Sequence, residues 1–144
     1  MTRSPSLLAC TAVLVAFAAP ASAKGWVAIC SDLQGMRVDD SGTEATFARD
    51  AIAGATWTYR WDAATKKATL TLPASHASDG KAHQQDGTVH AHRGGFFSIV
   101  SALPGAVWTH AIYPETGRLL AVQSTTKGNA LSGRMLTGSC TIAK

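Results

Sequence analysis

Three histidines in a stretch rich in Gly, Ser and Gln are the residues whose spacing could hold a metal. They flank Asp86-Gly87, a dipeptide that favours a two-residue hairpin turn. Such a turn would set His83 opposite His90, and His92 would share the face of His90. Three imidazoles about 5 to 8 Å apart would suit zinc or copper. The sequence therefore predicts a candidate metal site at His83, His90 and His92, and a loop without a ligand is the alternative interpretation.

A second candidate site, for an organic ligand, comes from one strand and the strand expected to follow it. His110 alternates onto the same face as Trp108, and the expected hairpin register places Gln123 opposite Trp108. An imidazole and an amide that face the interior of a small barrel could line a ligand cavity. They could equally satisfy each other as buried polar groups. The candidate ligand-binding residues are Trp108, His110 and Gln123.

A hairpin over residues 57–72 is the clearest structural signal. Trp57, Tyr59 and Trp61 alternate with polar residues, and 67–72 alternates again after a predicted four-residue loop. That loop length pairs Trp61 with Ala68, and it pairs Tyr59 with the leucine two residues further on. The aromatic stripe could stack a sugar, but such a stripe is more often core.

The same pattern returns at 108–118, with a loop over 114–117 that Gly117 would close in a left-handed conformation. An old duplication and a shared turn chemistry both explain the recurrence. Further strands are predicted at 26–30, 96–102, 118–125 and 134–142, with turn-rich breaks at 31–35, 39–42, 103–105 and 127–129.

Many short strands separated by turns predict an all-β domain, a small antiparallel barrel or a flattened sandwich. One segment, 42–54, fits this pattern poorly. Its first residues have capping-box spacing, and its apolar residues Phe47, Ala48, Ala51 and Ile52 share a helical face. A short helix and a pair of short strands are both compatible with this segment.

The first 23 residues read as a secretory signal peptide. Arg3 precedes an apolar run over 7–19, which is followed by Ala21-Ser22-Ala23, an A-x-A cleavage site. The run is too short to span a bilayer, so no membrane anchor is expected. Removal of 1–23 would leave a single β-rich domain over 24–144, delivered to the periplasm or to the outside of the cell.

Two cysteines, Cys30 and Cys140, would remain after cleavage. An oxidising compartment favours a disulfide between them, which would tie the first strand to the last. Two free buried thiols are the alternative. A redox-active pair is not expected, because the chain has no C-x-x-C motif.

Composition narrows the possible functions. Charged residues make up 15% of the chain, and the basic ones are scattered rather than gathered on one stripe, so nucleic-acid binding is not expected. The chain has no G-x-S-x-G, H-E-x-x-H or phosphate-binding glycine loop, and its 9 Asp and Glu residues form no evident pair. These observations favour binding over catalysis. A hydrolase with a spatially assembled site is the catalytic alternative.

Two kinds of small exported β-protein share this general plan. One is a ligand carrier in the manner of lipocalins, although Lys24-Gly25-Trp26 does not match their usual G-x-W. The other is an inhibitor that presents a loop, here 75–95, to a partner enzyme. We expect a monomer that binds a small molecule or a partner protein. No cofactor is expected, apart from the zinc or copper of the alternative histidine site.

Overall fold

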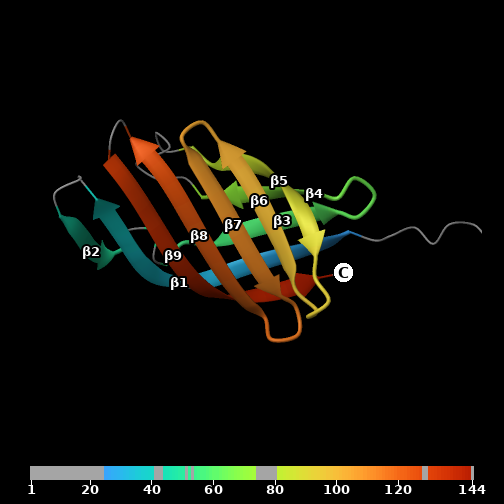
Figure 1. Cartoon of the computed structure of the whole chain (residues 1–144). Helices are drawn as coiled ribbons and strands as arrows, with labels where there is room; N and C mark the ends of the chain where they lie inside the picture. The colour runs from blue at the N-terminus through green and yellow to red at the C-terminus, as the bar shows by residue number, and fades with distance from the viewer. Residues whose placement is uncertain are drawn as a thin grey trace, which may run out of the picture.

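The structure is a computed structural model that describes residues 25–40, 44–50, 52, 54–73, 81–127 and 130–143. The predicted signal peptide, 1–23, lies outside these residues. The described chain forms one nine-stranded antiparallel sheet, and pairing of its first strand with its last closes eight strands into a barrel (Figure 1). The predicted all-β class is therefore confirmed, with a barrel rather than a sandwich.

The strands follow one another around the barrel with a single exception. The sheet order is β2-β1-β3-β4-β5-β6-β7-β8-β9, and β1 also pairs with β9. The strand bounds are β1 Trp26–Asp40, β2 Ala45–Arg49, β3 Trp57–Asp62, β4 Lys67–Leu72, β5 His83–Ala91, β6 Phe97–Leu103, β7 Ala106–Tyr113, β8 Arg118–Lys127 and β9 Ala130–Ala143. Strand β2 lies outside the barrel, beside the far half of β1 (Figure 1).

Strand β1 is much longer than the predicted segment 26–30. The predicted break at 31–35 is wrong, because β1 continues through it to Asp40 while pairing with β9. The register shifts between Ser31 and Gln34, and Asp32 has a φ of 53°. A β-bulge of this kind bends a strand without ending its ladder, which the turn-forming composition alone does not reveal.

The helix considered for 42–54 is wrong where the structure describes this segment. Residues 45–49 form β2 and pair with 36–40 of β1. The ladder with β1 satisfies the backbone groups on one side of this segment, whereas an isolated helix of this length is marginal in water. Gly54, considered as the helix end, has a φ of 88° and lies in a turn that the N–H of Ala55 closes by donating to the carbonyl of Ile52. The N–H of Gly54 itself donates to the carbonyl of Leu33.

Both predicted hairpins are present in the expected register. In the first, Trp61 lies opposite Ala68 and Tyr59 opposite Leu70. In the second, Trp108 lies opposite Gln123 and the loop ends in the predicted left-handed glycine. The alternation of apolar and polar residues fixes which face of each strand points inward, and so it also fixes the register.

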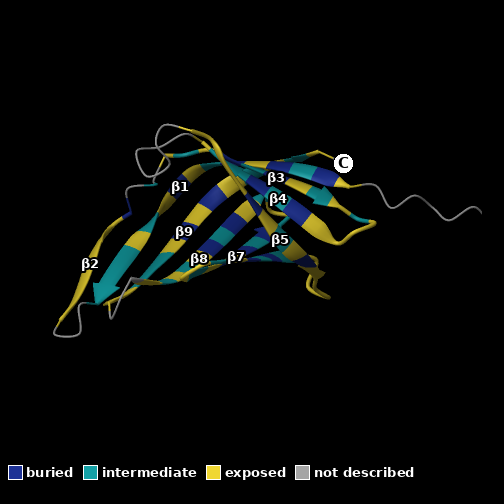
Figure 2. Cartoon of the chain, turned by 90° about the horizontal axis from the view of Figure 1, so that it is seen from above, coloured by how far each residue is buried: buried dark blue, intermediate teal, exposed yellow. Residues whose placement is uncertain are grey.

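The buried residues form one continuous core. Figure 2 marks buried positions in dark blue along the strands of the barrel. At one end, Trp26, Trp61 and Phe97 pack together with ring centroids 5.2 to 5.6 Å apart. These three aromatic side chains close that end of the barrel. The buried hydrophobic residues are Trp26, Ala28, Cys30, Leu33, Trp57, Tyr59, Ala68, Leu70, Val89, Ile99, Trp108, Ile112, Leu119, Ala121 and Leu136.

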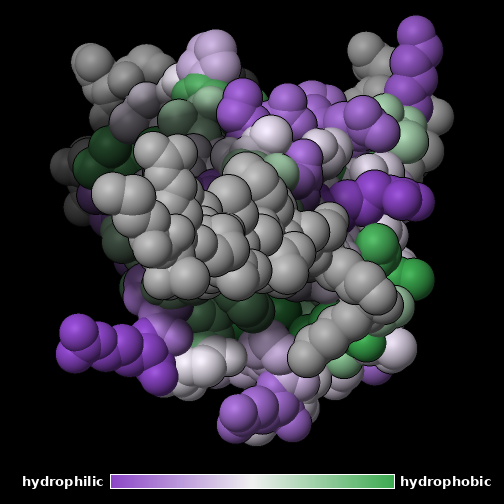
Figure 3. All heavy atoms as spheres, turned by 90° about the vertical axis from the view of Figure 1, so that its right-hand side faces the viewer, coloured by the Kyte–Doolittle hydropathy of each residue, from purple (hydrophilic) through white to green (hydrophobic). Residues whose placement is uncertain are grey.

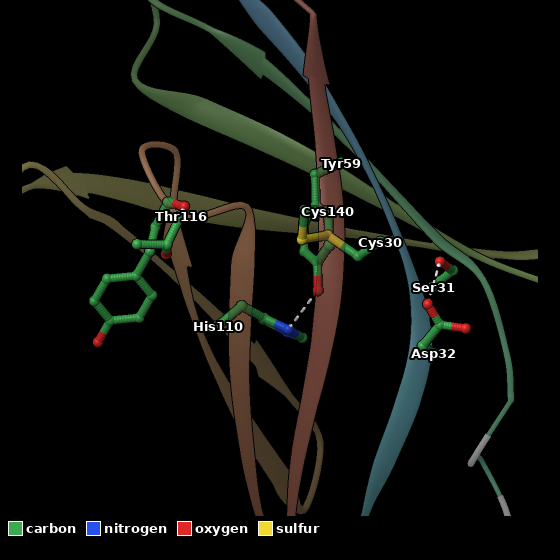
Figure 4. The surroundings of a disulfide bond; sticks show 8 residues. Cys30, Ser31, Asp32, Tyr59, His110, Thr116 and Cys140 are labelled. Atoms are coloured by element: carbon green, nitrogen blue, oxygen red, sulfur yellow. Dashed lines mark hydrogen bonds between the residues drawn. A yellow bond between two sulfur atoms is a disulfide. The ribbon is translucent and has the colours of Figure 1, made fainter.

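The predicted disulfide joins β1 to β9 at the closure of the barrel. Cys30 and Cys140 are direct cross-strand partners, and their sulfur atoms are bonded (Figure 4). Cys30 is fully buried. A structural disulfide is typical of proteins in a non-cytoplasmic, oxidising compartment.

The outer surface carries both hydrophilic and apolar side chains. Viewed from the side on which β1 begins, hydrophilic side chains project around the rim of the molecule (Figure 3). Among the described residues there is no helix long and apolar enough to cross a membrane.

Removing the disulfide tests the energetic role of barrel closure. The disulfide constrains the unfolded chain by joining residues that are 110 positions apart. The double variant Cys30→Ala, Cys140→Ala removes this constraint, so the unfolded state gains conformational entropy. We expect the free energy of unfolding to fall by roughly 2 to 5 kcal/mol, measured by urea titration. An unchanged midpoint would show that pairing of β1 with β9 closes the barrel without help from the bond.

A second stability test concerns close packing at β9. A Cβ on Gly138 would lie 2.7 Å from Leu33 Cδ2 and 2.9 Å from the carbonyl oxygen of Ser31. Gly138→Ala should therefore cost about 1 to 3 kcal/mol, as overpacking does. Gly94→Ala is the matched control, because its Cβ would meet Phe96 at an ordinary 3.5 Å. Equal unfolding midpoints for the two variants would contradict the predicted crowding.

Candidate functional site

A row of polar and aromatic side chains crosses four neighbouring strands on the inner face of the barrel. Ser101 on β6 pairs with Trp108 on β7, Trp108 pairs with Gln123 on β8, and Gln123 pairs with Arg134 on β9. We call these four residues the polar row. Each member is a direct cross-strand neighbour of the next, so their side chains point to the same side of the sheet.

Trp57 reaches the polar row from the opposite wall. In the order of the barrel, β3 and β7 are four strands apart out of eight, so they face each other. The ring of Trp57 meets Trp108 edge to face at 5.5 Å and meets His110 at 5.6 Å. Trp108 and His110 are themselves stacked at 5.3 Å. Two indoles and an imidazole therefore meet in the interior beside the polar row.

His110 is held from the far wall by a hydrogen bond. The hydroxyl of Tyr59 lies 3.0 Å from His110 Nδ1 (Figure 4). Burial raises the pKa of Tyr59 and lowers the pKa of His110 to about 4, so both groups are neutral at pH 7. We assign the phenol as the donor to Nδ1, because no other acceptor for its proton is described, and this places the ring proton of the neutral imidazole on Nε2.

Several buried polar atoms of this region have no hydrogen-bond partner, and three of them belong to almost fully buried side chains. They are Trp57 Nε1, His110 Nε2 and Ser101 Oγ, on side chains that are at most 1% exposed. Gln123 Oε1 is also without a partner. Buried polar atoms are almost always hydrogen-bonded, so a group of unsatisfied ones requires a physical explanation.

Arg134, the charged member of the polar row, forms an ion pair with Asp50. Arg134 Nε lies 3.3 Å from Asp50 Oδ2, and the Asp50 side chain is only 2% exposed. The guanidinium carbon also lies 5.9 Å from the centre of the Trp108 ring. Asp50 belongs to the segment after β2, and its backbone N–H donates to Gly35 O. The ion pair therefore ties that segment to the polar row.

The structure brings together all three predicted ligand-binding residues. Trp108, His110 and Gln123 lie side by side on the inner face of β7 and β8. His110 bonds Tyr59, and Gln123 Oε1 has no partner, so the two do not satisfy each other as the alternative interpretation held. A ligand-binding role for these residues stays a prediction.

The geometry predicted for the histidine site is wrong. Asp86-Gly87 lies inside the continuous strand β5, so His83 and His90 are seven residues apart on one strand instead of opposed. Each half of β5 already has a partner, β4 or β6, and this pairing outweighs the local turn preference. His92 hydrogen-bonds Ser98 Oγ at 2.7 Å. The described residues contain no group of three His, Cys, Asp or Glu side chains able to hold a metal.

The proposed inhibitory loop, 75–95, is also largely strand where it is described, because 83–91 form β5. Residues 74–80 lie outside the described residues. The aromatic stripe Trp57, Tyr59 and Trp61 belongs to the core or packs against it, as expected.

Sequence reasoning missed Ser101, Arg134 and Asp50. Ser101 and Arg134 lie on predicted strands, and extending the hairpin register across β6 and β9 could have placed them beside Trp108 and Gln123. Asp50 had no such signal, because the segment that carries it folds back only in the tertiary structure.

The side chains gathered here offer hydrogen-bonding groups without partners of their own. Among the described residues, Ser101 Oγ has no hydrogen-bond partner. The neutral imidazole and the indole N–H are donors suited to an acceptor group on a small molecule. No protein-family model matches the chain, and no curated protein matches it.

The buried histidine predicts a pH dependence of stability. The pKa of His110 is lowered from 6.5 to about 4 in the folded protein, so the unfolded state takes up a proton first as the pH falls. This contribution to stability is complete above pH 6.5 and is lost by pH 4. It amounts to about 3 kcal/mol.

The measurement compares urea unfolding at pH 7 and pH 4 for the wild type and for a double variant. The double variant, Tyr59→Phe with His110→Phe, leaves neither partner unpaired. Between pH 7 and pH 4 its free energy of unfolding should fall by about 3 kcal/mol less than that of the wild type. Equal losses in the two proteins would show that His110 titrates normally.

Proposed function

We propose that this protein is an exported binding module that takes one small, neutral, planar molecule at the end of the barrel lined by the polar row. The observation that carries the proposal is the set of unpartnered buried atoms on Trp57, Ser101 and His110. Leaving such an atom without a partner costs about 1 to 3 kcal/mol. A ligand that supplies hydrogen-bond acceptors at this place would recover that free energy.

The aromatic rings favour a planar ligand. Trp57 and Trp108 come from opposite walls and meet edge to face, and the imidazole of His110 stacks on Trp108. Indole faces bind flat apolar groups, while the N–H at the ring edge fixes their orientation. The side of the barrel that carries Trp26, Trp61 and Phe97 is closed by aromatic packing, so entry is expected from the polar row.

The electrostatics favour a neutral ligand over an anion. His110 is uncharged at pH 7, and the guanidinium of Arg134 is already paired with the buried carboxylate of Asp50. An anionic ligand would have to compete with Asp50 inside the barrel, and it would leave that carboxylate unpaired. Removing one partner of a buried ion pair costs several kcal/mol, which a small anion does not readily repay.

Export and binding agree with the remaining features. The disulfide is typical of an oxidising compartment, and the sequence of 1–23 predicts the signal that would deliver the chain there. The zinc or copper alternative loses its support, because the hairpin that would gather His83, His90 and His92 is absent.

The first test is the mass of the protein purified from the exported fraction, measured native and then denatured. A mass increment that is lost on denaturation identifies a bound molecule. The second test titrates the ligand-free protein with coumarin, a neutral planar lactone, and follows tryptophan fluorescence. Coumarin-3-carboxylate is the matched anion, and it should bind at least about tenfold more weakly.

Variants locate the binding site. Trp57→Phe removes one N–H donor and keeps the aromatic ring, and it should weaken coumarin binding about tenfold, the effect of one hydrogen bond. Trp61→Phe, at the closed end, should leave the affinity unchanged. A bare native mass together with no coumarin binding would contradict a ligand site in the barrel and would assign the free polar atoms to buried water.

A further inference from the structure

A serine and a histidine are hydrogen-bonded on the outside of the barrel, where β5 leads into β6 (Figure 1). His92 Nε2 lies 2.7 Å from Ser98 Oγ. Phe97 and Ile99, the neighbours of Ser98 on β6, belong to the core or pack against it, so Ser98 points outward. The pair is therefore separate from the barrel interior and from the ligand site proposed there.

His92 is held in place by its own turn and by two aromatic rings. Its backbone N–H donates to the carbonyl of Phe96 at 3.0 Å, and its carbonyl accepts from the N–H of Gly95 at 3.1 Å. Its ring stacks on Phe96 with the centroids 4.2 Å apart and 10° between the planes, and Phe96 stacks on Tyr113 at 5.0 Å. The imidazole is thus oriented toward Ser98 before any substrate arrives, which lowers the entropy cost of a reaction there.

An open hollow of about 560 Å³ lies beside this pair. His90, the cross-strand partner of Ser98, lines the hollow. So does Val100, which follows Ser98 on the same face of β6. Lys67 and Asp86 bring one cation and one anion to the lining, so their formal charges cancel. An uncharged molecule can therefore occupy the hollow with its reacting group beside the serine hydroxyl.

We propose that Ser98 and His92 form a catalytic dyad that hydrolyses small, uncharged esters on the outer face of the barrel. A hydroxyl nucleophile within hydrogen-bond distance of an oriented base is the arrangement that covalent ester hydrolysis uses. In this role Nε2 of His92 accepts the serine proton, so the neutral ring carries its own proton on Nδ1.

The reaction has two halves. In the first, Ser98 Oγ attacks the ester carbonyl carbon while its proton moves to His92 Nε2. The bond from that carbon to the alcohol oxygen then breaks, and the alcohol leaves with the proton from Nε2, so Ser98 carries the acyl group. In the second half, water attacks the acyl carbon and gives a proton to Nε2, which returns it to Ser98 Oγ as the acyl bond breaks. The products are one alcohol and one carboxylic acid, and both side chains are restored.

The test is hydrolysis of p-nitrophenyl acetate, an uncharged ester, by the purified protein with its disulfide intact. We expect release of p-nitrophenolate above the rate in buffer, and an acetyl group on Ser98 when the reaction is quenched in acid and mapped by peptide mass spectrometry. An exposed imidazole or amine can also react with such an ester. An acetyl group on a histidine or lysine in place of Ser98, or a rate equal to that in buffer, would overturn the proposal.

Variants separate a working dyad from two independent surface groups. Ser98→Ala and His92→Gln should each slow hydrolysis at least about tenfold, because each removes one half of the proton transfer. The double variant should be no slower than the slower single variant, since residues that act as a unit are not additive.

The matched controls make the same exchanges elsewhere on the surface. Ser124 is exposed on β8, and its cross-strand partners are Val107 and Gly133, neither of which is a histidine. His83 is exposed at the start of β5. Ser124→Ala and His83→Gln should keep the wild-type rate, and an unchanged urea midpoint shows that each variant is folded. A wild-type rate in Ser98→Ala, or losses in the two single variants that multiply in the double variant, would contradict the dyad.

Discussion

Pairing of β1 with β9 is the constraint on which the rest of the molecule depends. The first and last strands run side by side from Val27 to Asp40, interrupted by one bulge, and the disulfide lies within this seam. Closure removes the open edges of eight strands and separates the inside of the sheet from water. Only then do the indole of Trp57 and the imidazole of His110 become buried, and only then does the low pKa of His110 follow.

The barrel is built from two similar units that meet in its interior. Tyr59 and His110 are 51 residues apart, occupy equivalent places in the two hairpins and hydrogen-bond each other across the barrel. The same spacing relates Trp57 to Trp108, which are in contact. The correspondence also reaches the third strand of each unit, where Ala68 pairs with Gly87 and Leu119 pairs with Gly138. The likeness therefore extends beyond the two turns to the third strand of each unit.

The two units differ most at the polar row and the side chains that contact it. Tyr59 in one unit is matched by His110 in the other, and the second unit supplies Trp108, Gln123 and Arg134 of the polar row. The segment between β1 and β3 has no counterpart in the tight turn between β6 and β7, and it contributes both Asp50 and strand β2. This one segment thus provides the partner of Arg134 inside the barrel and strand β2 outside it.

The sequence by itself determined the two hairpins, their register, the disulfide and the inward face of Trp108, His110 and Gln123. These follow from alternation and turn chemistry, which act over a few residues, and from there being a single way to pair two cysteines. Tertiary structure decided the rest. Asp86-Gly87 stays extended because β4 and β6 both pair with that strand, and 45–49 is a strand because β1 offers it a ladder. Such partners lie far away in the chain, so a local preference that they outweigh does not predict the outcome.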